Sequence, residues 1–183
     1  MKRALLVIDV QNEFFSGEYQ VTYPKNSLQN IVSVMEKAKE CSLPIILIQH
    51  TNKKGSHHFQ QGTSAWDLHP QINGRSYDHY IEKKYPGAFT NTDLDEVLRS
   101  EGVDTVVITG YETNLCCDTT ARQAKHLGYH IEFLADATGT LDHENQMGFI
   151  SAQNLHQATL INHQAHFSKV MTVAQWCAEI QKK

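Results

Sequence analysis

The sequence predicts an α/β fold in which a doubly wound, mostly parallel sheet of six strands lies between two layers of helices. Short β-branched apolar runs suit buried parallel strands, and amphipathic segments with helical spacing separate them. The two kinds of segment alternate along the chain, which favours right-handed crossovers and helices on both faces of the sheet. No internal repeat or linker divides the chain, so we expect residues 1–183 to form one three-layer α/β/α, Rossmann-like domain.

The first half of the chain begins with a buried-strand pattern at Ala4–Ile8 and continues through a loop to an amphipathic helix over Ser27–Glu40. A second strand pattern, Pro44–Ile48, precedes the long polar segment Thr51–Asn73. A segment of that length without periodicity is more often functional than incidental, and we expect it to fold over a site as a lid. A short strand at Tyr80–Lys83 follows.

The second half of the chain continues the alternation. Its expected elements are a helix from Leu94 to Gly102, a strand at Val106–Thr109, a helix that starts near Cys116 and ends at Gly128, a strand at Ile131–Leu134, a helix at Glu144–Gln157, a strand at Ala158–Ile161 and a helix at Thr172–Ile180. The residues expected to face the sheet from the helix after Cys116 are Thr120, Ala121, Ala124 and Leu127.

Composition is typical of a globular chain, with 40% apolar and 20% charged residues. The net charge is −4 and the basic residues are scattered, so the sequence shows no basic patch that would bind nucleic acid. No apolar run approaches the ~20 residues of a membrane-spanning helix. The first apolar run is too short for a signal peptide, and four cysteines with two adjacent make a poor disulfide framework. We therefore expect a cytoplasmic protein with reduced thiols and neither a nucleic-acid nor a membrane partner.

Three side chains with complementary chemistry fall at the carboxyl ends of predicted strands: Asp9, Lys83 and Cys116. Open α/β sheets bind ligands at this edge. Each has an ordinary alternative, since Asp commonly caps turns, Lys is usually solvated and a free Cys is usually buried. Together they form a nucleophilic site in which the carboxylate takes the thiol proton and the ammonium supports both charges. The start of a helix favours a thiolate, and backbone N–H groups in the preceding turn can bind an oxyanion.

Four stretches of the chain carry a family pattern. They are Ala4–Phe14 (ALLVIDVQNEF), Glu82–Leu94 (EKKYPGAFTNTDL), Thr109–Ala124 (TGYETNLCCDTTARQA) and Ala135–Ala137 (ADA). In content and order they resemble the isochorismatase-like cysteine hydrolases. That superfamily includes nicotinamidases, N-carbamoylsarcosine and ureidoacrylate amidohydrolases, biuret hydrolase and isochorismatases.

The resemblance implies that the catalytic aspartate and cysteine fall on Asp9 and Cys116. The family lysine lies six residues before a motif phenylalanine, here Phe89, which implies Lys83 rather than Lys84.

The resemblance also concerns the residues around the nucleophile. Cys117 stands where the family usually has valine, which implies a packing role. A non-proline cis peptide is implied between Tyr111 and Glu112, an arrangement that would aim the N–H groups of Glu112 and Cys116 at an oxyanion.

The implied activity is hydrolysis of a C–N bond, amide or ureide, in a small molecule through a thioester on Cys116. Asp9 would act as general base and acid, Lys83 would give electrostatic support, and no cofactor would be needed. Two alternatives stay open. One is an isochorismatase-type vinyl ether hydrolase, and the other is a non-catalytic domain that binds a small molecule or senses redox state through Cys116 and Cys117.

Nicotinamidases carry a metal site after the second strand, an Asp-x-His with a further His. The matching stretch here is His50-Thr51-Asn52, which lacks the aspartate and the first histidine. His57 and His58 lie nearby, but adjacent loop histidines are usually solvated. We therefore expect no metal and no nicotinamidase activity.

Aromatic side chains are expected to form the wall of the substrate pocket. They are Phe14, Trp66, Tyr85, Tyr111 and Phe167. Such a wall, with few fixed charges, suits a small, neutral, planar amide or ureide. Because relatives are commonly oligomeric, a homo-oligomer, either a dimer or a tetramer, is also expected.

Overall fold

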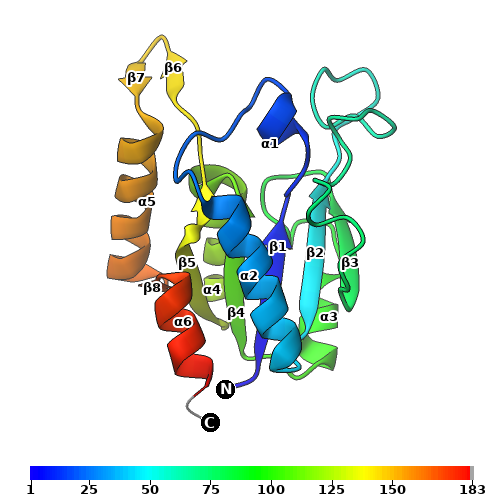
Figure 1. The fold of residues 1–183 in the computed structure, drawn as a ribbon, viewed down its shortest axis with the longest axis vertical. Helices are drawn as coiled ribbons and strands as arrows, with labels where there is room; N and C mark the ends of the chain where they lie inside the picture. The colour runs from blue at the N-terminus through cyan, green and yellow to red at the C-terminus, as the bar shows by residue number, and fades with distance from the viewer. Residues whose placement is uncertain (182–183) are drawn as a thin grey trace.

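A computed structural model of the chain describes residues 1–181, and within them six strands form a parallel sheet. The order across the sheet is β3-β2-β1-β4-β5-β8. The strands are β1 (Arg3–Ile8), β2 (Ile45–His50), β3 (His79–Lys83), β4 (Thr105–Tyr111), β5 (His130–Gly139) and β8 (Lys169–Met171). With helices on both faces (Figure 1), this arrangement confirms the three-layer α/β/α fold.

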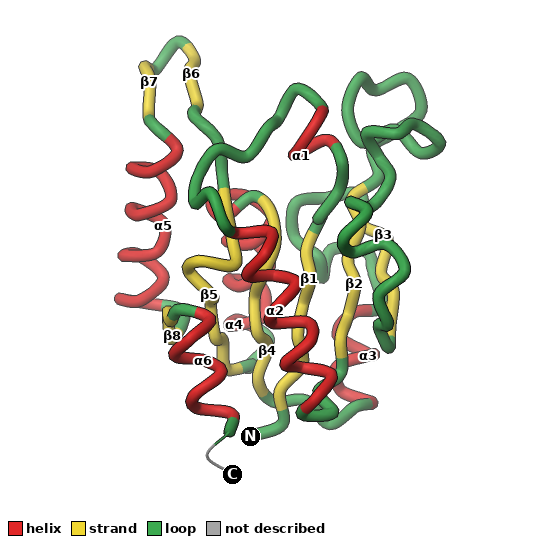
Figure 2. Tube along the Cα trace, viewed as in Figure 1, coloured by secondary structure: helices red, strands yellow, loops and turns green. Residues whose placement is uncertain are grey.

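Helices cover the sheet on both sides. The longer ones are α2 (Ser27–Glu40), α3 (Leu94–Ser100), α4 (Asp118–His126), α5 (Ala152–His166) and α6 (Val173–Ile180). Figures 1 and 2 show α2 and α6 in front of the sheet and α3 and α4 behind it. A one-turn helix, α1 (Glu13–Ser16), follows β1, and a π-helix, η1 (Thr113–Cys117), joins β4 to α4.

Alternation along the central strands divides their side chains between two apolar cores. In β1, Leu5 and Val7 pack toward α2, whereas Leu6 and Ile8 pack toward α3 and α4. All six residues of β1 are buried, as expected for a central strand covered on both faces.

The close approach of β1 and β4 depends on Gly110. This residue is paired with Ile8 and has φ of 114°, a conformation that favours glycine. A Cβ at position 110 would lie 1.9 Å from the Ile8 carbonyl oxygen. The missing side chain therefore allows the ends of these two strands, and the residues that follow them, to come together.

Two elements predicted near the carboxyl end are wrong. Instead of a helix from Glu144, the chain forms a hairpin of β6 (His143–Asn145) and β7 (Gly148–Ile150), and α5 then begins at Ala152. The segment Ala158–Ile161, predicted as the sixth strand, lies inside α5, and the sixth strand is β8. A short apolar run does not distinguish strand from helix by itself, and here the helix continues through it.

Leu127 also differs from expectation. It forms the C-cap of α4 and is 41% exposed, whereas Thr120, Ala121 and Ala124 are buried against the sheet as predicted. Because α4 ends at His126, the Leu127 side chain does not continue the row of helix residues that faces the sheet. Within residues 1–181 no helix is both long and apolar enough to cross a membrane.

Candidate active site

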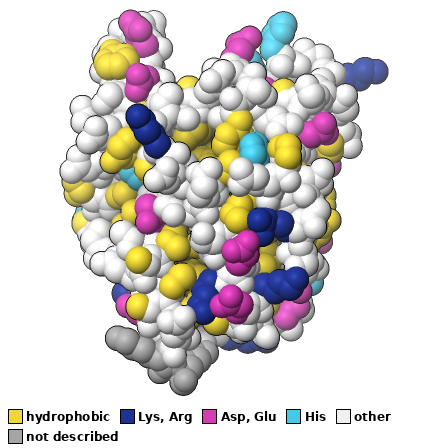
Figure 3. Space-filling view, in the orientation of Figure 1, with side chains coloured by type: hydrophobic (Ala, Val, Ile, Leu, Met, Phe, Trp, Pro, Cys, Tyr) yellow, Lys and Arg dark blue, Asp and Glu magenta, His cyan; other side chains and the backbone are white. Residues whose placement is uncertain are grey.

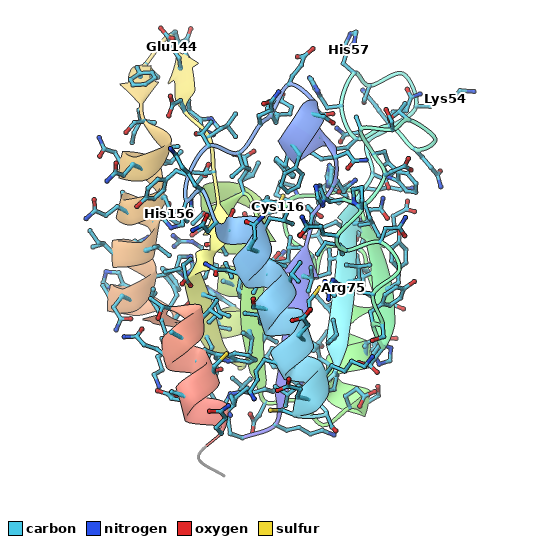
Figure 4. The ribbon with its side chains drawn as sticks, in the orientation of Figure 1. Lys54, His57, Arg75, Cys116, Glu144 and His156 are labelled. Carbon is cyan, nitrogen blue, oxygen red and sulfur yellow. The ribbon has the colours of Figure 1, made fainter. Side chains whose placement is uncertain are left out.

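The three predicted reactive side chains meet at the carboxyl edge of the sheet. Asp9 follows β1, Lys83 ends β3 and Cys116 lies in η1, directly after β4. The Nζ of Lys83 is 2.7 Å from Oδ2 of Asp9 and 3.3 Å from Sγ of Cys116. Asp9 and Lys83 are each 1% exposed and Cys116 is 7% exposed. Figure 4 labels Cys116 near the upper end of the sheet, below the opening between the hairpin and the loops.

Backbone contacts fix the position of Asp9. Its N–H donates to the Ile48 carbonyl of β2, and its own carbonyl accepts from the N–H of Gln11. Asp9 has φ of 52°, in the left-handed region that aspartate tolerates better than most residues. The turn directs the carboxylate toward Lys83 immediately after the strand ends.

Lys83 also contacts His50 and Tyr85. Its Nζ lies 3.1 Å from Nδ1 of His50 and 3.1 Å from the carbonyl oxygen of Tyr85. An ammonium group can only donate, so Nδ1 of His50 accepts and the ring proton resides on Nε2. That Nε2 lies 2.9 Å from Oδ1 of Asn52, which accepts its proton. Burial and the charge of Lys83 lower the pKa of His50, which keeps the ring neutral.

The protonation states follow from these contacts. Burial acts to lower the pKa of Lys83, but the negative charge of Asp9 and the contact with Cys116 outweigh it and hold that pKa above its usual value. Burial, together with the Asp9 carboxylate, raises the pKa of Cys116, and Lys83 only partly opposes this. The resting Cys116 side chain is therefore a thiol, not the thiolate that its place before a helix suggested, because desolvation outweighs the helix dipole.

Asp9 is well placed to take the thiol proton. Its Oδ2 forms the ion pair with Lys83, while no described residue donates a hydrogen bond to its buried Oδ1. A charged carboxylate beside a protonated thiol is the arrangement that general base catalysis requires.

The turn before the nucleophile is held from two sides. The peptide bond between Tyr111 and Glu112 is cis, as the family resemblance implied. The Glu112 carboxylate is buried and its Oε2 lies 3.0 Å from Nε2 of His143 and 3.3 Å from Oγ1 of Thr140. At the next position, Oγ1 of Thr113 lies 2.9 Å from Nδ1 of His156, a buried side chain of α5.

A cavity of about 520 Å³ opens onto the thiol. Phe14, Tyr19 and Phe59 supply an aromatic wall. Further lining residues are Asp9, His50, Asn52, His58, Lys84, Pro86, Glu112, Leu115, Cys116 and His143. In Figure 3 this edge of the molecule is a notch between the β6–β7 hairpin and the loops on the opposite side.

Comparison with known proteins agrees with this fold. The Isochorismatase domain family matches residues 3–175, which is most of the chain. The chain belongs to the isochorismatase family. It is a hydrolase of that family.

Three similar proteins illustrate the relationship. Nicotinamidase 3 of Arabidopsis thaliana is 34% identical over 87% of this chain and 79% of its own length. The isochorismatase family protein YddQ of Bacillus subtilis is 31% identical over 86% of this chain and 89% of its own length. A crystal structure from Burkholderia xenovorans LB400 is 40% identical, covers 98% of this chain and 87% of that chain, and superposes with a TM-score of 0.96.

The cavity of this isochorismatase-family protein differs from the expected aromatic wall. Phe14 lines it, but Tyr111 packs behind Phe14 at a ring distance of 5.5 Å, with its hydroxyl bonded to Ser27. Trp66 lies against the α2-side core, and its indole N–H donates to Oγ1 of Thr51 at 2.8 Å. Neither ring lines the cavity: Tyr111 belongs to the apolar core, and Trp66 packs against that core and supports the loop.

Tyr85 and Phe167 also lie elsewhere. The Tyr85 side chain is 49% exposed and lines a neighbouring polar cavity of about 680 Å³, although its carbonyl holds Lys83. Phe167 follows α5, where the guanidinium of Arg122 lies 4.2 Å from its ring centre. The aromatic residues that replace them in the wall, Tyr19 and Phe59, come from irregular segments whose positions no sequence periodicity indicates.

The stretch that corresponds to the metal site of nicotinamidases is built differently here. Both ring nitrogens of His50 are engaged, one with Lys83 and one with Asn52. His58 contacts Glu13 at 3.1 Å through Nδ1. Among the described residues, no three His, Cys, Asp or Glu side chains converge as a metal-binding group. These residues do not fit the metal site of nicotinamidases.

Proposed function

We propose that the protein is a cysteine hydrolase that cleaves a C–N bond, amide or ureide, of a small molecule through a thioester intermediate. The contact of one buried ammonium, that of Lys83, with both Asp9 and Cys116 carries this proposal. Similarity to a relative named as a nicotinamidase supports hydrolysis of this bond class.

The first half of the proposed reaction forms the thioester. Asp9 accepts the proton of Cys116 as the sulfur attacks the substrate carbonyl carbon, forming a C–S bond. The N–H groups of Glu112 and Cys116 would stabilise the oxyanion. The C–N bond then breaks, and Asp9 returns the proton to the departing nitrogen.

The second half restores the enzyme. Asp9, again a carboxylate, takes a proton from water as the water oxygen attacks the thioester carbon. The C–S bond breaks, the sulfur regains its proton and the carboxylic or carbamic acid leaves. Lys83 keeps its charge throughout, which lowers the energy of each state that carries negative charge on sulfur or on Asp9.

The redox-sensing alternative is weaker than the hydrolase. Redox-sensing cysteines are exposed and have a lowered pKa. Here burial raises the pKa of both Cys116 and Cys117, and Cys117 is fully buried in the core beneath α4. Cys117 therefore fits the packing role that its position implied.

The proposal is tested by measuring ammonia release from a panel of small amides, ureides and carbamoyl compounds. We expect Cys116→Ala to abolish turnover while the thermal unfolding transition is retained. Cys177→Ala in α6 is the matched control, because that half-buried thiol lies outside the cavity. Turnover that survives in Cys116→Ala would contradict the thioester route, and a vinyl ether substrate hydrolysed by that variant would favour isochorismatase-type chemistry.

A further inference from the structure

One carboxylate in the active-site cavity, that of Glu112, has an oxygen without a hydrogen-bond donor among the described residues. In Glu112, His143 and Thr140 both approach Oε2, and no described side chain or backbone group donates to Oε1. Glu112 lines the same cavity as the Cys116 thiol, and its Oε1 is accessible rather than buried without a partner. Oε1 of Glu112 is thus an acceptor atom of the cavity that lacks a donor.

This acceptor favours a ligand that carries an N–H group. Oε1 of Glu112 is accessible and has no donor among the described residues, so a bound N–H group can donate to it. A hydrogen bond to a charged group typically contributes about tenfold or more to affinity. The Glu112 side chain does not need to reorganise on binding, because Nε2 of His143 holds Oε2 at 3.0 Å. The position of Oε1 is therefore set before the ligand arrives.

The roles of the Asp9 and Glu112 carboxylates differ. Asp9 is the proposed proton carrier, so it protonates the nitrogen that leaves. A plain amide has one nitrogen on the carbonyl carbon and gives Glu112 no partner there. A ureide has a second nitrogen, on the other side of the same carbonyl, and its N–H is the donor that Glu112 lacks.

We propose that Glu112 is a specificity-determining residue that selects ureides over plain amides by accepting a hydrogen bond from the nitrogen that does not leave. This inference rests on the proposed C–N hydrolase function and narrows its substrate class. The aromatic wall of Phe14, Tyr19 and Phe59 leaves room for an apolar substituent on that second nitrogen.

The test uses two ligands that differ by one group. Benzylurea and 3-phenylpropanamide share a terminal carboxamide and a phenyl ring, and an N–H in the first replaces a CH₂ in the second. We expect benzylurea to bind about tenfold or more tightly than 3-phenylpropanamide, the size of effect expected for a hydrogen bond to a charged group.

Glu112→Gln should remove this preference. His143 would keep the glutamine oxygen at the Oε2 position, which turns the amide NH₂ toward the ligand and replaces the acceptor by a donor. We expect the ratio of kcat/KM for benzylurea to kcat/KM for 3-phenylpropanamide to fall about tenfold in this variant. Glu144→Gln is the matched control, because Glu144 is exposed and projects from the tip of the hairpin in Figure 4.

Binding to a Cys116→Ala background separates this inference from the proposed reaction. Calorimetry should show tighter binding of benzylurea than of 3-phenylpropanamide, and adding Glu112→Gln should equalise the two. An unchanged preference in Glu112→Gln, an equal loss for both ligands, or binding of neither would overturn the selective role of Glu112. Each of these outcomes can occur whether or not Cys116 proves to be the nucleophile.

Discussion

Asp9 and Lys83 form an ion pair of 2.7 Å in which neither side chain is more than 1% exposed. Removing one partner of a buried pair leaves an uncompensated charge, which typically costs about 3–5 kcal/mol. We expect Asp9→Asn and Lys83→Met each to lower the free energy of unfolding by about this amount, and the double variant to lose much less than the sum.

Urea unfolding of the two single variants and the double variant measures this coupling. The ion pair of Lys37 and Glu40, in which the Glu40 side chain is 66% exposed, is the control. Its coupling free energy should be much smaller, because solvent screens the two charges. Additive effects of Asp9→Asn and Lys83→Met would mean that the pair does not compensate charge in the folded protein. Turnover should be lost in all three variants.

The raised pKa of Cys116 makes a prediction for thiol reactivity. Because burial and Asp9 favour the thiol, we expect its alkylation by iodoacetamide to accelerate steadily from pH 7 to above pH 9, without a plateau at low pH. At pH 8 the folded protein should react more slowly at Cys116 than the urea-unfolded chain, whose thiols have a pKa near ~8.5. A rate plateau below pH 7 would instead reveal a resting thiolate.

His50 holds Lys83 through Nδ1, so its removal should weaken catalysis more than binding. We expect His50→Leu to lower kcat about tenfold with little change in KM, because Lys83 loses an acceptor that fixes its ammonium. His50→Gln, which retains an acceptor, should recover part of the loss. The exposed His126, replaced by Leu, is the control. Equal kcat in His50→Leu and the unmodified protein would show that His50 does not position Lys83.

Gly110 and Gly128 are a matched pair of variants that tests the close contact of β1 with β4 next to Asp9. Both have positive φ, but a Cβ at position 110 meets the Ile8 carbonyl whereas one at position 128 meets nothing within 4 Å. We expect Gly128→Ala to cost about 1–2 kcal/mol from backbone conformation alone. Gly110→Ala should cost at least about 2 kcal/mol more and reduce turnover. Similar unfolding free energies for the two variants would contradict the steric role of Gly110.

His156 should make stability fall as the solution is acidified. Burial lowers its pKa from 6.5 to about 4, so between these values the unfolded chain binds a proton that the folded protein does not. This lowers the free energy of unfolding by about 2 kcal/mol at pH 5 relative to pH 7. His156→Gln should reduce that pH dependence, and the exposed His126→Gln should not. Urea unfolding at the two pH values provides the measurement.

Much of the catalytic edge follows from local sequence. The short apolar runs of β1 and β4 are typical of central strands, and parallel strands bring their carboxyl ends together. The sequence therefore predicts that Asp9, Lys83 and Cys116 lie at one edge of the sheet, and the structure places them there.

The sixth strand shows where sequence patterns were insufficient. In α5 the buried positions include His156 and His163, so the apolar periodicity that marks a sheet-covering helix is interrupted by polar residues. Each is satisfied by a tertiary contact, His156 with Thr113 and His163 with Asp118. Those contacts, and not propensity, decide that residues 158–161 are helical.

The sequence by itself determined the layered fold and the three reactive side chains, because both depend on short-range patterns and on the shared direction of parallel strands. Tertiary structure decided the protonation state of Cys116 and the composition of the cavity. Segments far apart in the chain bury the Cys116 thiol. They also place Tyr19, Phe59 and Glu112 in the same cavity. No local pattern records how such segments pack against one another.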